Sequence, residues 1–141
     1  MTPRILTDNY HVSPQISPED AAAIRDAGYV MVLDNRPDAE VPPEFQTDAM
    51  REAMEAAGLR FEALPLTHQT MNAENILAQA DLVASANGPV LAYCASGTRC
   101  TVIWALANVE SMGTDAVLET AARAGYDISG LRPTLNALAE K

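Results

Sequence analysis

The chain has 141 residues, of which 48% are hydrophobic, and this size and composition predict one globular domain over residues 1–141. Lys+Arg 9 against Asp+Glu 19 gives a net charge of -10, which disfavours nucleic acid or an anionic membrane as a partner. No signal peptide or membrane-spanning stretch is visible, so the two cysteines suggest a reducing compartment, the cytoplasm. His11 and His68 lie far apart, and because no Cys/His group has metal-ligand spacing, neither a metal nor an organic cofactor is implied.

Strands and helices alternate along the sequence. Ser17 and Pro18 have the residue types of an N-cap and a first helical position, and Gly58 and the Asn87-Gly88 pair end helical segments. The predicted strands cover residues 10–12, 29–34, 60–66 and 89–93, and the predicted helices cover 17–28, 47–57, 72–86, 100–110, 114–124 and 131–139. This order favours an α/β fold with a mostly parallel central sheet and helices on both faces.

Ligand sites of such sheets form beyond the carboxyl ends of the strands. Three predicted loops follow strands in this way, at residues 35–40, 67–71 and 94–99. We therefore expect these three loops to form the walls of one site.

The third loop carries a cysteine and an arginine. The apolar run 89–93 ends at Cys94, and Arg99 precedes a helical segment; between them lie Ala95, Ser96, Gly97 and Thr98. Loop N–H groups and the positive end of the helix dipole would stabilise a thiolate and bind an anion there. The pattern predicts attack by the Cys94 thiolate on sulfur or phosphorus, with Arg99 as a catalytic cation and the four loop residues binding the anion. The alternative, a merely buried strand-end cysteine, leaves Gly97 and Arg99 unexplained.

Four other residues are candidates for accessory roles. Arg36 or Asn35 could reach into the site, or Asp38 could orient Arg99; alternatively these residues only form the turn that leaves the strand. His68 is either a substitute general acid or an exposed loop histidine without a catalytic role.

Cys100 is a further accessory candidate. It should lie in the first turn of the helix, close beneath Cys94. Two interpretations stay open: it forms a reversible disulfide with Cys94 or accepts sulfur from it, or it is a small filler in place of serine.

These residues lie in segments that resemble a family of small bacterial sulfurtransferases with a protein-tyrosine-phosphatase-like fold. The same domain occurs at the N-terminus of beta-lactamase-hydrolase-like proteins, fused to a persulfide-oxidising metallohydrolase domain. The matching segments are 12–16, 35–38 with Glu40, 57–59, 64–67, 88–91, 94–99 with Trp104, and 124–127. The resemblance implies Cys94 as nucleophile, residues 95–98 as anion cradle, Arg99 as anion clamp, and a persulfide-oxidising enzyme as a candidate partner.

Two positions depart from this family pattern. Ala95 stands where such loops usually carry a basic residue, and Cys100 stands where they carry serine or threonine. Because a thiol donates a weaker hydrogen bond than a hydroxyl, Cys94 is expected to be less acidic than in relatives.

Sulfur transfer and phosphate transfer both fit a small anionic substrate. Tyrosine phosphatases have five residues between the cysteine and the arginine, whereas this loop has four, as in the Cys-x-x-Gly-x-Arg form of single-domain rhodaneses. Phosphatases also use an aspartic acid that precedes the cysteine, and residues 61–71 contain none. We therefore expect a rhodanese-like sulfurtransferase that moves a sulfane sulfur from a thiosulfate or persulfide donor to a thiol or cyanide through a Cys94 persulfide. The alternatives are a phosphatase that acts through a phosphocysteine, and a non-catalytic module that senses redox state or anions.

Overall fold

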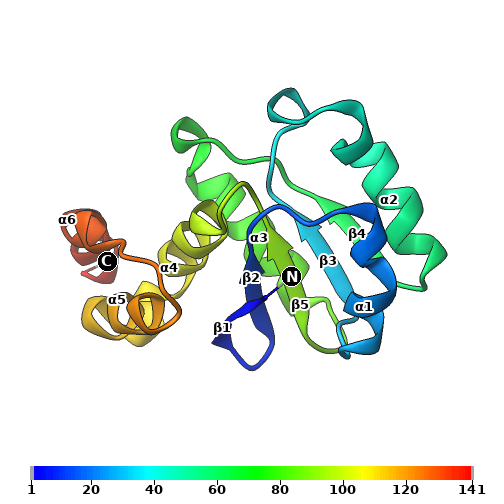
Figure 1. Ribbon diagram of the computed structural model, residues 1–141. Helices are drawn as coiled ribbons and strands as arrows, with labels where there is room; N and C mark the ends of the chain where they lie inside the picture. The colour runs from blue at the N-terminus through cyan, green and yellow to red at the C-terminus, as the bar shows by residue number, and fades with distance from the viewer. Residues whose placement is uncertain (1, 141) are drawn as a thin grey trace.

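The computed structural model describes residues 2–140 and contains a five-stranded sheet in the order β1-β2-β5-β3-β4 (Figure 1). Strands β2, β5, β3 and β4 run parallel, and β1 is antiparallel to β2 at one edge. The strands are β1 (Arg4–Thr7), β2 (Tyr10–Ser13), β3 (Met31–Asp34), β4 (Arg60–Ala63) and β5 (Val90–Tyr93). The helices are α1 (Ala21–Asp26), α2 (Thr47–Ala56), α3 (Ala73–Ala84), α4 (Thr98–Met112), α5 (Thr114–Arg123) and α6 (Arg132–Ala139). The predicted α/β fold with a mostly parallel sheet is confirmed.

Strand β1 is the element that the sequence did not predict. Only Leu6 of its four residues is buried, and Ile5 is 62% exposed, so the segment lacks the apolar pattern of the inner strands. It pairs with β2 through a short turn and covers that edge of the sheet. The side chain of Arg4 also donates a hydrogen bond to the Ala124 carbonyl at 3.0 Å, which ties β1 to the end of α5.

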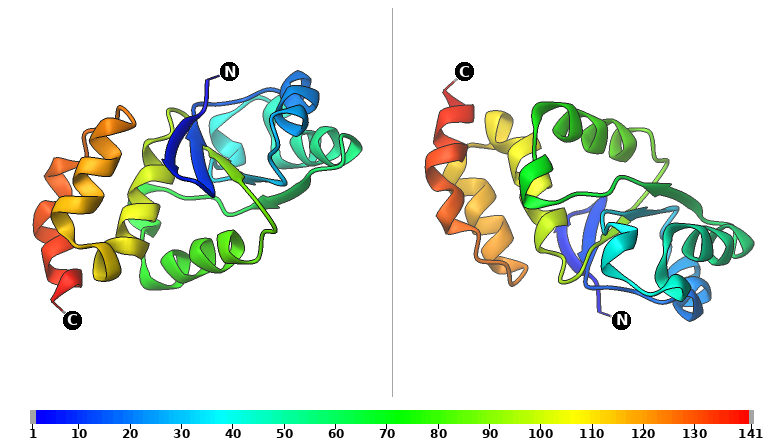
Figure 2. Two further views of the ribbon diagram at one scale, coloured as in Figure 1. Left: turned by 90° about the horizontal axis from the view of Figure 1, so that it is seen from below. Right: turned by 90° about the horizontal axis from the view of Figure 1, so that it is seen from above.

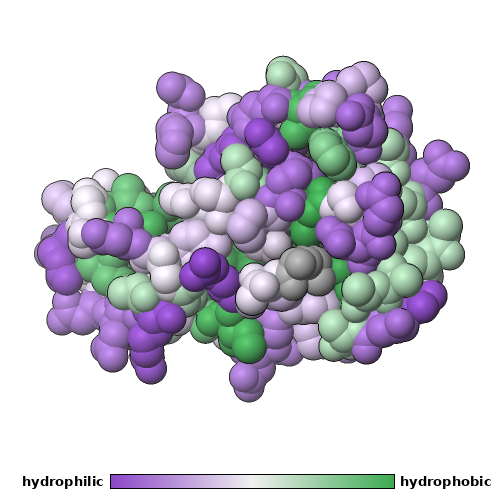
Figure 3. All heavy atoms as spheres, viewed as in Figure 1, coloured by the Kyte–Doolittle hydropathy of each residue, from purple (hydrophilic) through white to green (hydrophobic). Residues whose placement is uncertain are grey.

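Two apolar cores lie on opposite faces of the sheet because side chains alternate along each strand. In β5, Val90 and Ala92 face the core beneath α4, α5 and α6, whereas Leu91 and Tyr93 face the core beneath α1 and α2. Figure 2 shows these helix layers on either side of the sheet, with α5 and α6 packed outside α4. Much of the surface seen in Figure 3 is hydrophilic, in agreement with the many charged residues of the chain. Within residues 2–140, no helix combines the length and apolarity that crossing a membrane would require.

The parallel strands bring the three predicted loops to one edge of the sheet. Short 3-10 turns shape two of these loops: η2 (Asp38–Glu40) follows β3, and η4 (His68–Thr70) follows β4. The third loop connects β5 directly to α4. The carboxyl edge of the sheet is therefore where the candidate chemistry gathers.

Candidate active site

Cys94 lies at the base of the loop between β5 and α4. Its side chain is almost fully buried, with 1% of the residue exposed. The backbone N–H of Gly97 donates a hydrogen bond to Cys94 Sγ at 3.2 Å, and the N–H groups of Arg99 and Cys100 also point at this sulfur. The loop thus folds around the sulfur.

This environment makes Cys94 acidic. Hydrogen bonding by the neighbouring Cys100 side chain and by the surrounding backbone N–H groups lowers the pKa of Cys94 to about 5 despite its burial. At neutral pH the side chain is a thiolate, the nucleophilic form of cysteine.

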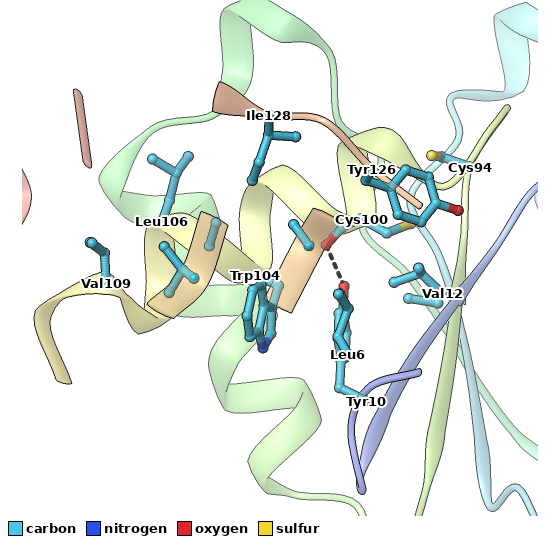
Figure 4. Packing of buried hydrophobic residues seen from close by; sticks show 14 of the residues in the cluster. Leu6, Tyr10, Val12, Cys94, Cys100, Trp104, Leu106, Val109, Tyr126 and Ile128 are labelled. Atoms are coloured by element: carbon cyan, nitrogen blue, oxygen red, sulfur yellow. Dashed lines mark hydrogen bonds between the residues drawn. The ribbon is translucent and has the colours of Figure 1, made fainter. Parts of the chain in front are cut away.

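Cys100 itself stays protonated. Its side chain is fully buried, and burial together with the neighbouring Cys94 thiolate raises its pKa well above the usual value for a thiol. The Tyr10 hydroxyl donates to the Cys100 carbonyl at 2.7 Å and fixes the first turn of α4 from below (Figure 4). Cys100 can therefore act as a hydrogen-bond donor to the Cys94 sulfur.

The loop conformation requires glycine at position 97. Gly97 has a φ of 95°, and a Cβ there would collide with the Tyr126 hydroxyl. That hydroxyl donates a hydrogen bond to the Ser96 carbonyl at 2.9 Å, so the segment after α5 supports the loop. Thr101 closes the first turn of α4 because its side chain donates to the Gly97 carbonyl at 2.9 Å.

Arg99 is held by a carboxylate from the loop after β3. Its two terminal nitrogens contact both carboxylate oxygens of Glu40, at 2.8 and 2.7 Å, and one of them also donates to the Leu66 carbonyl at 2.9 Å. This forked pair lowers the pKa of Glu40 and raises that of Arg99. Glu40, not Asp38, orients Arg99.

The prediction for Asp38 is wrong because its carboxylate is used elsewhere: it accepts hydrogen bonds from the Thr47 backbone N–H and hydroxyl, both at 2.8 Å, at the start of α2. Asn35 does not reach into the site either. Its buried amide donates to the Leu64 carbonyl and to Gln79, both at 2.9 Å, and thereby joins two loops.

Arg36 approaches the site indirectly. Its Nε lies 3.2 Å from Glu40, and a terminal nitrogen donates to Gln15 at 3.1 Å. The Gln15 backbone N–H in turn donates to the Ala95 carbonyl at 3.2 Å. Arg36 and Gln15 therefore brace Glu40 and the cysteine loop. The opposite charges of Arg36 and Glu40, four residues apart, are the sequence signal that could have marked Glu40.

Above the loop lies an open cleft of about 580 Å³. Its lining residues are Glu40, Thr67, His68, Gln69, Ser96, Thr98 and Arg99. All three predicted loops contribute to this lining, so their convergence is confirmed. Two side chains of this lining, Glu40 and His68, belong to the residue types that serve as general acids, and Glu40 is engaged by Arg99. His68 is therefore the candidate proton donor of the cleft.

The arrangement can therefore do three things chemically. The Cys94 thiolate can attack an electrophilic centre, the loop N–H groups and Arg99 can hold its negative oxygens, and His68 can protonate a departing oxygen.

Comparison with known proteins gives concordant matches. A family model for the beta-lactamase hydrolase-like protein, phosphatase-like domain, matches residues 3–111. The beta-lactamase hydrolase-like protein of Xylella fastidiosa strain Temecula1 is 29% identical over 104 residues, which are 74% of this chain and 24% of that protein. The chain thus spans about a quarter of the length of this curated relative.

Solved structures agree. A Neisseria meningitidis Z2491 protein, provisionally described as a phosphatase, has a TM-score of 0.86 and 28% identity, and the match covers 96% of both chains. A cysteine-to-serine variant of P. aeruginosa TpbA in complex with phosphotyrosine has a TM-score of 0.68 and 17% identity, covering 95% of this chain and 85% of that one. The expected phosphatase-like fold is confirmed.

The predicted main activity is wrong, because the matching family and the Neisseria structure are described as phosphatase-like and not as sulfurtransferases. The predicted persulfide-oxidising partner likewise finds no support. The structure explains the error. The four residues between cysteine and arginine indicate a rhodanese by sequence, yet this loop borders an open cleft that two other loops also line. The missing aspartic acid was read as a missing acid, yet His68 lies in that cleft.

Proposed function

Because the chain belongs to the family of beta-lactamase hydrolase-like protein phosphatase-like domains, we propose that it is a cysteine-dependent phosphatase acting on phosphate monoesters. The observation that carries this proposal is the Cys94 thiolate, with a pKa of about 5, at the base of a loop whose residues Ser96, Thr98 and Arg99 line the cleft. A small anionic substrate fits this cleft, and TpbA, which shares the fold, binds phosphotyrosine.

The reaction has two steps. Cys94 Sγ attacks phosphorus and forms an S–P bond, while the P–O bond to the leaving group breaks and its oxygen takes a proton from His68. Water then attacks phosphorus and gives a proton back to His68, the S–P bond breaks, and inorganic phosphate and the Cys94 thiolate are released. The loop N–H groups and Arg99 stabilise the phosphoryl oxygens in both transition states.

His68 is assigned the acid role by its position in the cleft. A phenoxide or alkoxide leaves poorly unless it is protonated, and general acid catalysis contributes about 10²–10⁴-fold. The acid form of Glu40 is disfavoured because Arg99 lowers its pKa.

A paired assay tests the proposal. Wild-type protein should release phosphate from phenyl phosphate, and Cys94→Ser should abolish this release. His68→Gln should slow hydrolysis of phenyl phosphate by about 10²-fold or more, but slow 2,4-dinitrophenyl phosphate far less, because that leaving group departs without a proton. Gln69→Ala, the neighbouring residue in the same cleft, serves as the matched control.

The outcomes separate the alternatives. Equal losses of both substrates in His68→Gln would remove the acid role from His68 and leave the nucleophile in place. No phosphate release by wild type, with a titratable Cys94 thiolate, would overturn the phosphatase and favour a module that senses anions or redox state.

The same proposal includes one phosphatase-like domain over residues 1–141 and a reducing compartment such as the cytoplasm. Cores on both faces of a single sheet support the first, and the two free thiols at the site, Cys94 and Cys100, support the second.

A further inference from the structure

A second hollow lies beside the catalytic cleft, and its walls are mainly apolar. We call it the apolar groove; it has a volume of about 380 Å³ and is lined by Met71 after η4, Val102 and Leu106 of α4, and Ile128 and Leu131 before α6. Leu106 and Ile128 lie on the same side of α4 (Figure 4). The phosphoryl chemistry described above does not use this groove.

The groove continues directly from the cleft. His68 lines both hollows. On α4, Thr98 lines the cleft, and Val102 and Leu106, four and eight residues later, line the groove. Residues at this spacing lie on one helix face, so a single stripe of α4 runs from the anion site into the apolar groove.

The opposite wall is fixed relative to the catalytic loop. Tyr126 hydrogen-bonds the Ser96 carbonyl, and it directly precedes the groove residues Asp127 and Ile128. A hydrophobic pocket whose walls are held in place in this way favours binding of a rigid apolar group.

Charge restricts what the groove can accept. Asp127 is exposed at its edge, and hydrogen bonds from Ser129 lower the pKa of its carboxyl group, so it is ionised. A second negative group on the substrate would meet this carboxylate as well as the net charge of -10.

We propose that the apolar groove binds the leaving group of the substrate, which is an aromatic or similarly apolar alcohol without a second negative charge. The inference rests on the proposed phosphatase activity. With the phosphoryl group above Cys94, the leaving oxygen lies opposite the sulfur, near His68, and the group attached to it extends from the cleft into the groove.

The test compares 2-naphthyl phosphate with phenyl phosphate, whose leaving groups have similar acidity. Wild type should prefer 2-naphthyl phosphate by about tenfold in kcat/KM, because the second ring is buried in the groove. Val102→Ser and Leu131→Ser should reduce this preference, and Thr134→Trp, at an exposed position on the groove, should block the groove and bring the ratio towards one.

Leu77→Ser is the matched control, since Leu77 is an apolar residue of α3 that is 64% exposed and lies outside the groove. It should keep the wild-type ratio. Thermal unfolding of each variant verifies that it is folded, and Thr134→Trp keeps the test informative if a serine variant is not.

Equal kcat/KM for the two esters in wild type, or a preference that survives in all three groove variants, would overturn the inference while the phosphatase proposal stands. Absence of Cys94-dependent turnover of either ester would overturn the proposed function, and the inference with it.

Discussion

Cys100 lowers the pKa of Cys94 more than any other side chain does. Hydrogen bonding by its thiol is the largest contribution that lowers this pKa. That Cys94 is less acidic than in relatives with serine or threonine at this position stays a prediction. A thiol is a weak donor, but Cys100 is fully buried. Water does not compete there for the hydrogen bond to the charged sulfur, and the low dielectric strengthens that bond.

Replacement of Cys100 tests this role. Cys100→Ala removes the donor and should raise the pKa of Cys94 above its value of about 5, whereas Cys100→Ser keeps a donor and should hold it low. The measurement is the ultraviolet absorbance of the thiolate as a function of pH, with Cys94→Ser as the blank. Equal pKa values in the alanine and serine variants would show that the backbone N–H groups alone set the acidity.

At the scale of elements, the site depends on a contact between two loops that the sequence does not relate. Glu40 of η2 and Arg99 of α4 are 59 residues apart, and their forked pair joins the loop after β3 to the loop after β5. Arg99 is mostly buried, so a guanidinium in that position needs a fixed partner.

Glu40 is therefore a positioning residue. Glu40→Gln keeps an acceptor but loses the charge, so Arg99 should shift and kcat for phenyl phosphate should fall, by up to about a hundredfold. The fall should be larger in kcat than in the affinity for phosphate, with little change in thermal stability. Glu44→Gln, an exposed glutamate of the same connection, is the control. An unchanged kcat would remove Glu40 from the catalytic arrangement.

The order of strands and helices explains how much of the fold and of the site could be predicted from the sequence. The alternation of strands and helices predicts a parallel sheet, and a parallel sheet brings the loops carrying Cys94 and His68 to one edge. By contrast, the partner of Arg99 depends on side-chain directions within η2, which no periodicity encodes, and so Asp38 was chosen instead of Glu40. Strand β1 escaped prediction because Ile5 faces outward. The reaction was misjudged because loop length says little about the width of the cleft, which residues of η2 and η4 also define.

At the scale of the whole molecule, a buried acidic side chain at the carboxyl edge of the sheet lowers the free energy of unfolding when it ionises. Asp34 ends β3 between the two cores, and burial raises the pKa of its carboxyl group to about 6. Its carboxylate accepts a hydrogen bond from the Arg36 backbone N–H at 2.8 Å. Ionisation of this buried group opposes folding.

Replacement of Asp34 by asparagine should reveal how much the ionisation of this carboxyl group destabilises the fold. The pKa of Asp34 is higher in the folded protein than the ordinary value of 3.8, so folding favours the protonated form. Its contribution is complete below about pH 4 and is lost as the pH rises through 6, where the folded carboxyl must also ionise. Asparagine keeps the acceptor for the Arg36 N–H and does not ionise. The free energy of unfolding of the variant minus that of wild type should therefore rise by about 2–3 kcal/mol between pH 4 and pH 8. Urea unfolding at both pH values measures this difference, and Asp48→Asn, in the first turn of α2, is the control. A difference that does not change with pH would mean that Asp34 ionises equally easily in the folded and unfolded chains.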